Sequence, residues 1–137
     1  MSDRKPIIFT AAVFASCSFA AMMTAPVSPA EEETVTYEVM SESVKVLDIE
    51  YFDGHERRQL QNVTLPWRET VAMASPRSLG MDGADLRADW RSTIAGRAIW
   101  LKDHWVTVRI YIGDTLRCQN TLAVGNAACY GSTSFKS

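Results

Sequence analysis

A run of 21 residues, from Ile7 to Val27, contains no charged side chain and follows a short basic stretch. The run is long enough to cross the hydrocarbon core of a bilayer, which takes about 20 residues. It also fits a secretory signal peptide, because Ser28-Pro29-Ala30 supplies small residues for cleavage. A buried core helix is a third interpretation. The sequence therefore predicts export, with residues 1–30 acting as a signal peptide or as a membrane anchor.

The rest of the chain, residues 31–137, has the size of one exported domain. The formal net charge of the protein is only −2. Nucleic-acid binding depends on neutralising phosphates, and binding to anionic lipid depends on a basic stripe. The charge balance therefore argues against nucleic acid as a partner. Contact with a membrane is expected only through residues 7–27, if they are not cleaved.

Apolar and polar side chains in this domain alternate with a period of two, as they do in β-strands. The clearest example is 105–112, and similar patterns occur at 34–39 and 44–52. Asp53-Gly54 has the composition of a hairpin turn after the last of these. Further strands are expected at 59–65, 67–73, 84–90, 116–118 and 127–130, whereas 91–104 fits either a helix or a strand.

Pro66 has no N–H group to donate, so the strand at 67–73 is expected at the edge of a sheet or after a bend. Short strands separated by closely spaced turns are typical of a sandwich. We therefore predict an all-β fold, a small immunoglobulin-like β-sandwich of about seven strands after an N-terminal hydrophobic helix.

Two cysteines, Cys118 and Cys129, lie in the exported part. An even number of cysteines in an oxidising compartment predicts one disulfide between them. A zinc site is the alternative, but such a site needs four ligands at short spacing. Neither His55 nor His104 lies close to the two cysteines in sequence.

The chain has few groups suited to catalysis. It has only two histidines, and it has no nucleophile elbow, no HExxH motif and no glycine-rich phosphate loop. Asp82, Asp85 and Asp89 suggest calcium, but their alternation with apolar residues favours the solvated face of a strand. We expect no enzymatic activity, no cofactor and no bound metal.

The four tryptophans are more than a domain of this size needs for its core. Large aromatic side chains that are not needed inside tend to mark contact surfaces. Trp100, His104 and Trp105 lie close together in sequence and form a candidate binding surface, to which we add Trp67. The alternative is that the tryptophans lie in the core or at the ends of the sheets.

Several short motifs resemble the mycobacterial MmpS family. They are Val35-Thr36-Tyr37-Glu38-Val39, Ile49-Glu50-Tyr51-Phe52-Asp53, Leu65-Pro66-Trp67 and the segment 108–114, followed by a late Cys129. The resemblance extends from about residue 34 to residue 129 and includes the N-terminal apolar run. Leu-Pro-Trp after a Tyr-Glu-Val strand is its most distinctive part.

The resemblance implies a membrane-anchored accessory protein with a small periplasmic β-sandwich. Members of the family assist MmpL-type RND transporters that export lipids and siderophores. The chain departs from the family pattern in two places: Cys118 follows the hairpin turn instead of preceding it, and 91–104 is diverged or inserted. These departures affect the expected partner more than the expected fold.

Two functions follow from these features. The first is a tethered accessory protein of an MmpL/RND-type exporter on the periplasmic side of the membrane, with lipid or siderophore cargo. The second is a freely secreted or surface module that binds a host or envelope ligand. Retention of residues 7–27 distinguishes the first from the second.

Overall fold

The computed structural model describes residues 31–91 and 104–134, so the apolar run 7–27 and the expected N-terminal helix lie outside it. All the regular elements in the described part are strands. They are β1 (Glu33–Met40), β2 (Val46–Phe52), β3 (Arg57–Thr64), β4 (Trp67–Met73), β5 (Asp85–Asp89), β6 (Val106–Ile112), β7 (Thr115–Leu122) and β8 (Asn126–Tyr130).

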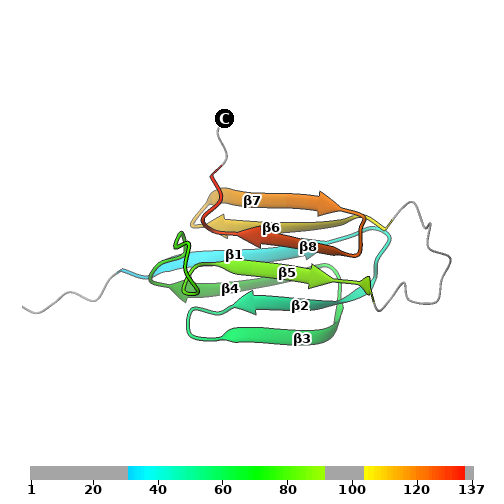
Figure 1. Ribbon diagram of the computed structural model, residues 1–137, viewed down its shortest axis with the longest axis horizontal. Coiled ribbons are helices and arrows are strands. Elements are labelled where there is room, and N and C mark those ends of the chain that lie inside the picture. Colours follow the sequence, from blue (N-terminus) through cyan, green and yellow to red (C-terminus); the bar gives the residue numbers. More distant parts are fainter. Residues whose placement is uncertain (1–30, 92–103, 135–137) are drawn as a thin grey trace, which may run out of the picture.

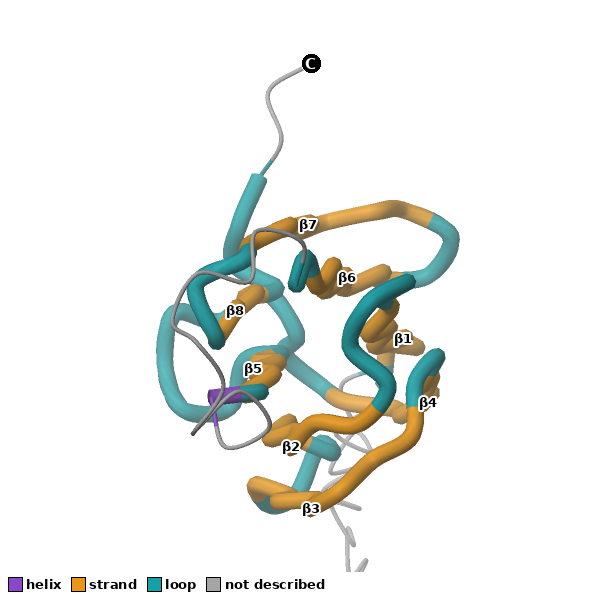
Figure 2. The backbone as a smooth tube through the Cα atoms, turned by 90° about the vertical axis from the view of Figure 1, so that its right-hand side faces the viewer, coloured by secondary structure: helices purple, strands orange, loops and turns teal. Residues whose placement is uncertain are grey.

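The strands form two antiparallel sheets of four strands each, in the orders β4-β1-β6-β7 and β3-β2-β5-β8. Figure 2 shows them as two layers that face each other. The predicted all-β sandwich is confirmed, with eight strands in place of about seven. Each strand range expected from the sequence corresponds to an observed strand, and the largest difference in length is at β7, which continues to Leu122 instead of ending near Cys118.

The period of two places one face of each central strand in the core. In β1, Val35, Tyr37 and Val39 are fully buried, and in β6 the four alternating aliphatic side chains are buried as well. β2 and β5 supply the opposite wall. Its buried side chains are Leu47, Ile49, Tyr51, Leu86 and Ala88, and fully buried Trp90 follows β5.

The predicted hairpin at Asp53-Gly54 connects β2 to β3. Gly54 has a φ of +97°, and a Cβ at this position would lie 2.4 Å from the backbone oxygen of Ala72. The turn therefore requires glycine for both its conformation and its space. β4 is an edge strand, as expected for a strand that begins directly after Pro66.

Strand direction gives the sandwich two distinct ends. β1 begins at Glu33 at the left of Figure 1, where the described chain starts, and we call this the proximal end. The β4–β5 loop (74–84) lies there too. The β1–β2 loop (41–45), the β3–β4 turn (65–66) and the β7–β8 loop (123–125) lie at the opposite, distal end.

Candidate functional site

A groove of about 740 Å³ lies at the distal end of the sandwich. Met40, Pro66 and Trp105 give it apolar walls, and its polar lining residues are Ser41, Glu42, Ser43 and Thr107. Trp105 and Thr107 alternate with the buried Val106, so both lie on the face of the sheet that is turned away from the core. We call this hollow the distal groove.

Ser41 connects the two sides of the distal groove. Its hydroxyl group donates a hydrogen bond of 2.6 Å to the backbone oxygen of Trp105. The hydroxyl oxygen of Ser41 also accepts the backbone N–H groups of Val44 at 2.9 Å and of Ser43 at 3.2 Å. A side-chain oxygen that accepts N–H groups two and three residues ahead stabilises a tight turn. One serine thus shapes the β1–β2 loop and holds it against the start of β6.

The structure separates the residues of the predicted binding surface. Trp105 lines the groove and its side chain is 53% exposed. His104 is half-buried beside it, and its Nδ1 atom is buried without a hydrogen-bond partner in the described part of the chain. Trp100 lies outside the described residues.

Trp67 is not part of the groove, because its ring packs against the core. The centre of this ring lies 5.3 Å from that of Tyr51, and Tyr51 in turn lies 5.4 Å from Tyr37. Trp67 pairs with Val39 of β1, whose side chain points inward, so the same direction follows for Trp67. The sequence interpretation missed Met40, Ser41 and Pro66 as lining residues, although Pro66 lies within the Leu-Pro-Trp motif.

A second hollow, of about 520 Å³, lies where the two sheets diverge between their edge strands β3 and β4. Tyr51, Leu60 and Val71 form its apolar part. Its charged and polar lining is provided by Glu32, Asp53, His55, Arg58 and Glu69. Desolvation raises the pKa of Tyr51, so its hydroxyl group stays neutral in this hollow at ordinary pH.

The carboxyl group of Asp53 at this hollow has a lowered pKa. The backbone N–H groups of Glu56 and His55 lower the pKa of its carboxyl group to about 2, and the guanidinium of Arg58 adds to the effect. One carboxylate oxygen accepts both N–H groups at 2.8 Å, and the other binds Arg58 at 2.7 Å. These contacts close the β2–β3 turn, so Asp53 has a structural role.

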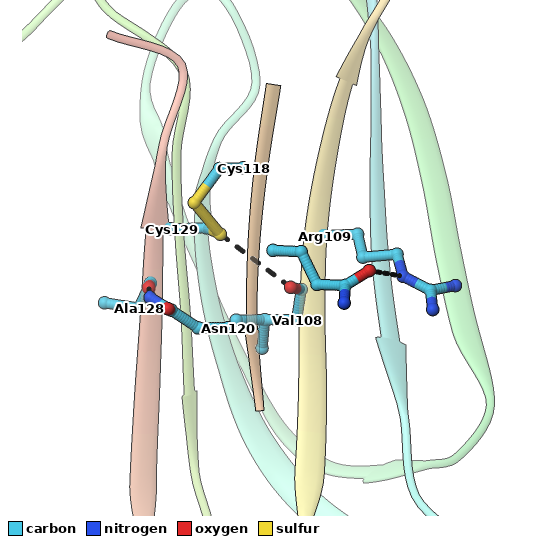
Figure 3. Close-up of a disulfide and its surroundings, with 7 residues drawn as sticks. Val108, Arg109, Cys118, Asn120, Ala128 and Cys129 are labelled. Atoms are coloured by element: carbon cyan, nitrogen blue, oxygen red, sulfur yellow. Dashed lines mark hydrogen bonds between the residues drawn. A yellow bond between two sulfur atoms is a disulfide. The ribbon is translucent and has the colours of Figure 1, made fainter. Parts of the chain in front are cut away.

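The margin of the sandwich formed by β7 and β8 is closed covalently. The predicted disulfide between Cys118 of β7 and Cys129 of β8 is present and joins the two sheets (Figure 3). The side-chain amide of Asn120 donates a hydrogen bond of 2.5 Å to the backbone oxygen of Ala128 across the same gap. The β7–β8 margin of the sandwich is therefore covalently linked, whereas the β3–β4 margin contains the second hollow.

No group of three histidine, cysteine or acidic side chains suited to a metal ion occurs within 31–91 and 104–134. Arg57 binds Asp85 at 2.7 Å, and Arg91 binds Asp89 and lowers the pKa of that carboxyl group. Two of the three carboxylates that suggested calcium thus have guanidinium partners, and the third, Asp82, accepts the Ser78 hydroxyl group at 2.6 Å. The chemistry available in the distal groove is hydrogen bonding around an apolar surface, which is suited to binding.

A family of sequences described as "Mycobacterium membrane protein" matches residues 7–82, which is more than half of the chain. The chain belongs to this family. The family includes MmpS-like proteins, so the resemblance seen in the sequence motifs is confirmed. No curated protein matches the chain.

The family match covers the apolar run 7–27 and strands β1 to β4, and it ends within the β4–β5 loop. The motif at 108–114, the disulfide and Trp105 lie beyond it. This mycobacterial membrane-associated protein therefore combines a matched first half with a second half that provides Trp105 and the disulfide. Among the described residues, no helix has the length and apolar character needed to cross a bilayer.

Proposed function

We propose that this protein is a non-enzymatic accessory protein of the mycobacterial cell envelope. Residues 7–27 stay attached as a membrane anchor, and the sandwich lies on the periplasmic side. There it assists an MmpL/RND-type exporter of lipids or siderophores. Family membership supports the membrane association, and the disulfide is consistent with an oxidising compartment outside the cytoplasm.

The observation that carries this proposal is the placement of the distal groove relative to the start of the chain. β1 begins at the proximal end, and only five residues separate Val27 from Glu33. The groove lies at the other end of strands that are seven to eight residues long, or roughly 25 Å away. An anchored sandwich would therefore present the groove away from the bilayer, toward the extracytoplasmic part of a partner.

The lining of the groove is suited to a protein surface or an apolar cargo. Tryptophan is enriched in the residues that contribute most to binding, and methionine adapts to irregular apolar partners. Ser41, Glu42 and Thr107 add hydrogen-bonding groups around Met40 and Trp105. This combination is typical of a binding site with an apolar centre and a polar rim.

The first test concerns the anchor. The N-terminus of the mature protein is sequenced after extraction from mycobacterial membranes. The proposal expects residues 7–27 to be present and the protein to remain in the membrane fraction. A mature chain that begins at Glu31 and is recovered from the culture fluid would contradict it.

The second test concerns the groove. Cells that lack the protein are complemented with the unchanged chain, with Trp105→Ala, or with Val124→Ala as a matched control at the distal end. Exported and retained lipids and siderophores are then measured in each strain. We expect Trp105→Ala to reduce export and Val124→Ala to leave it unchanged. Equal export from all three strains would remove the groove from the proposal.

A freely secreted binding module is the alternative function. It is favoured by Ser28-Pro29-Ala30, which offers small residues for cleavage directly before the described domain. In that case the distal groove would bind a host or envelope ligand. The N-terminus of the mature protein distinguishes the two functions.

A further inference from the structure

The β4–β5 loop exposes two large apolar side chains at the proximal end. Leu79 is 93% exposed and Met81 is 90% exposed. Tyr130, at the end of β8, is 44% exposed and lines a small hollow together with them. We call Leu79, Met81 and Tyr130 the proximal apolar tip. Neighbouring exposed apolar side chains of this kind mark a surface that contacts another molecule or a membrane.

The base of the loop is packed tightly, so the tip cannot simply fold back into the core. Pro76 is fully buried, and its backbone oxygen accepts the N–H of Ala84 at 2.9 Å. The N–H of Gly131 donates to the backbone oxygen of Ala84, also at 2.9 Å. A Cβ at Gly131 would lie 2.1 Å from the oxygen of Pro76, so the two segments touch directly.

The part of the loop that carries Leu79 is also fixed. The hydroxyl of Ser78 donates to Asp82 at 2.6 Å and accepts the N–H of Gly80 at 3.0 Å. A Cβ at Gly83 would lie 2.2 Å from the backbone oxygen of Ser78, which shows how closely the loop doubles back. The exposure of Leu79 and Met81 is therefore a property of the folded loop.

The loop lies next to the point where the chain leaves toward the apolar run. Arg77, two residues before Leu79, binds Glu33 at the start of β1 at 2.5 Å. The distance from Val27 to Glu33 covers six steps along the chain and is at most about 22 Å even when the chain is fully extended. If residues 7–27 cross a bilayer, the apolar tip is therefore held close to the surface of that bilayer.

We propose that the proximal apolar tip inserts into the lipid at the membrane surface and thereby docks the sandwich on the bilayer. This inference rests on the proposed function, because it requires residues 7–27 to remain attached. Leu79 and Met81 would reach the acyl-chain boundary. Tyr130 would lie at the level of the headgroups, where tyrosine is enriched in membrane proteins.

The charges at this end favour an apolar contact over an electrostatic one. Two arginines beside the tip have acidic partners: Arg77 binds Glu33, and Arg57 binds Glu50 and Asp85. Exposed Glu31 and Glu32 precede β1 and would repel anionic headgroups. Docking should therefore occur on zwitterionic lipid and change little with salt.

Two or three side chains are too few to hold a free domain on a membrane with useful affinity. A tether changes this, because it makes docking an intramolecular step at a high effective concentration. The contact would then fix the orientation of a domain that is already attached. With the proximal end docked, the distal groove would point away from the lipid.

The experiment uses the full chain reconstituted in phosphatidylcholine vesicles whose acyl chains carry bromine, a quencher of tryptophan fluorescence. Leu79→Trp places a reporter at the apolar tip, and Val124→Trp places a matched reporter at an exposed distal site. The tryptophan fluorescence of the unchanged chain is subtracted from that of each variant. We expect most of the emission added by Leu79→Trp to be quenched and that added by Val124→Trp to be unaffected.

Equal and weak quenching of both reporters would overturn the inference. So would quenching of Leu79→Trp that requires anionic lipid and disappears at high salt, because it would show headgroup attraction. Met81→Trp replaces Leu79→Trp if the latter unfolds at a lower temperature than the unchanged chain. Flotation of the chain with the vesicles reports the anchor separately, so failed docking can be told apart from a failed anchor.

Discussion

The hydroxyl group of Ser41 donates a hydrogen bond of 2.6 Å to the backbone oxygen of Trp105, across 64 residues of sequence. The contact joins the β1–β2 loop to the start of β6, on the two sides of the distal groove. The orientation of Trp105 therefore depends on a loop from the half of the chain that matches the family. The groove is shared between the matched and unmatched halves.

Replacement of Ser41 by alanine should loosen the distal groove without disrupting the core. Ser41→Ala removes the donor to Trp105 and the acceptor for Val44, so we expect a loss of about 1 kcal/mol in the free energy of unfolding. Urea unfolding followed by fluorescence measures it. Ser75→Ala is the control, because Ser75 is exposed in the β4–β5 loop at the opposite end of the sandwich. Equal effects of the two variants would contradict the assigned role.

Tyr37→Phe should test a hydrogen bond that links the two sheets. The buried Tyr37 hydroxyl of β1 donates to the backbone oxygen of Phe52 at 2.7 Å. Its removal leaves that oxygen without this donor, so we expect a destabilisation of about 1–2 kcal/mol. Tyr130→Phe, at a far more exposed position, should change the free energy of unfolding little. Chemical unfolding of both variants provides the comparison.

Reduction of the disulfide should destabilise the domain while leaving the sheets able to form. Cys118 and Cys129 are 11 residues apart in sequence, and closing a loop of this size stabilises by about 3 kcal/mol in the chain-entropy model. The free energy of unfolding is compared with and without reductant. The double variant Cys118→Ala with Cys129→Ala should match the reduced protein and no longer respond to reductant. A reductant-sensitive double variant would show that the effect arises elsewhere.

The stability of the β2–β3 turn should depend on pH through Asp53. Its pKa is lowered in the folded protein to about 2, from the ordinary value of 3.8 for an aspartate side chain. Between these values the unfolded chain binds more protons than the folded one, so protonation favours unfolding. The contribution of Asp53 is therefore present above about pH 4 and is lost as the pH falls toward 2.

Asp53→Asn tests this expectation, because asparagine cannot ionise. We expect the thermal midpoint of the unchanged protein to fall more steeply between pH 4 and pH 2 than that of Asp53→Asn. His55→Ala in the same exposed turn is the control and should keep the steeper fall. Parallel curves for the unchanged protein and Asp53→Asn would contradict the role of the carboxylate.

Local patterns in the sequence predicted the local structure well. The alternation from Val106 to Ile112 sets the buried face of β6. Asp53-Gly54 forms the β2–β3 turn because Gly54 has a positive φ, which glycine adopts readily. Strand order was not predictable in this way. The position of β1 between β4 and β6 depends on pairing between residues far apart in sequence.

The tryptophans show where the same reasoning reaches its limit. The alternation of side chains along β6 already places Trp105 on the face opposite to the buried Val106. The exposure of Trp105 therefore follows from the sequence pattern. Trp67 begins a strand that mixes charged and apolar residues, and its inward direction becomes evident only from its pairing with Val39. The distal groove could not be predicted as a whole, because its walls come from three separate connections and from the ends of two strands, β1 and β6.

The central position of β1 has a mechanical consequence. Its hydrogen bonds to β4 on one side and β6 on the other are perpendicular to the strand, as in any antiparallel ladder. A pull that reaches Glu33 along the chain would therefore load both ladders in shear at the same time. An edge strand pulled in the same direction would have only one ladder to resist the load. The strand nearest the apolar run is thus the one best placed to withstand tension between a membrane and the domain.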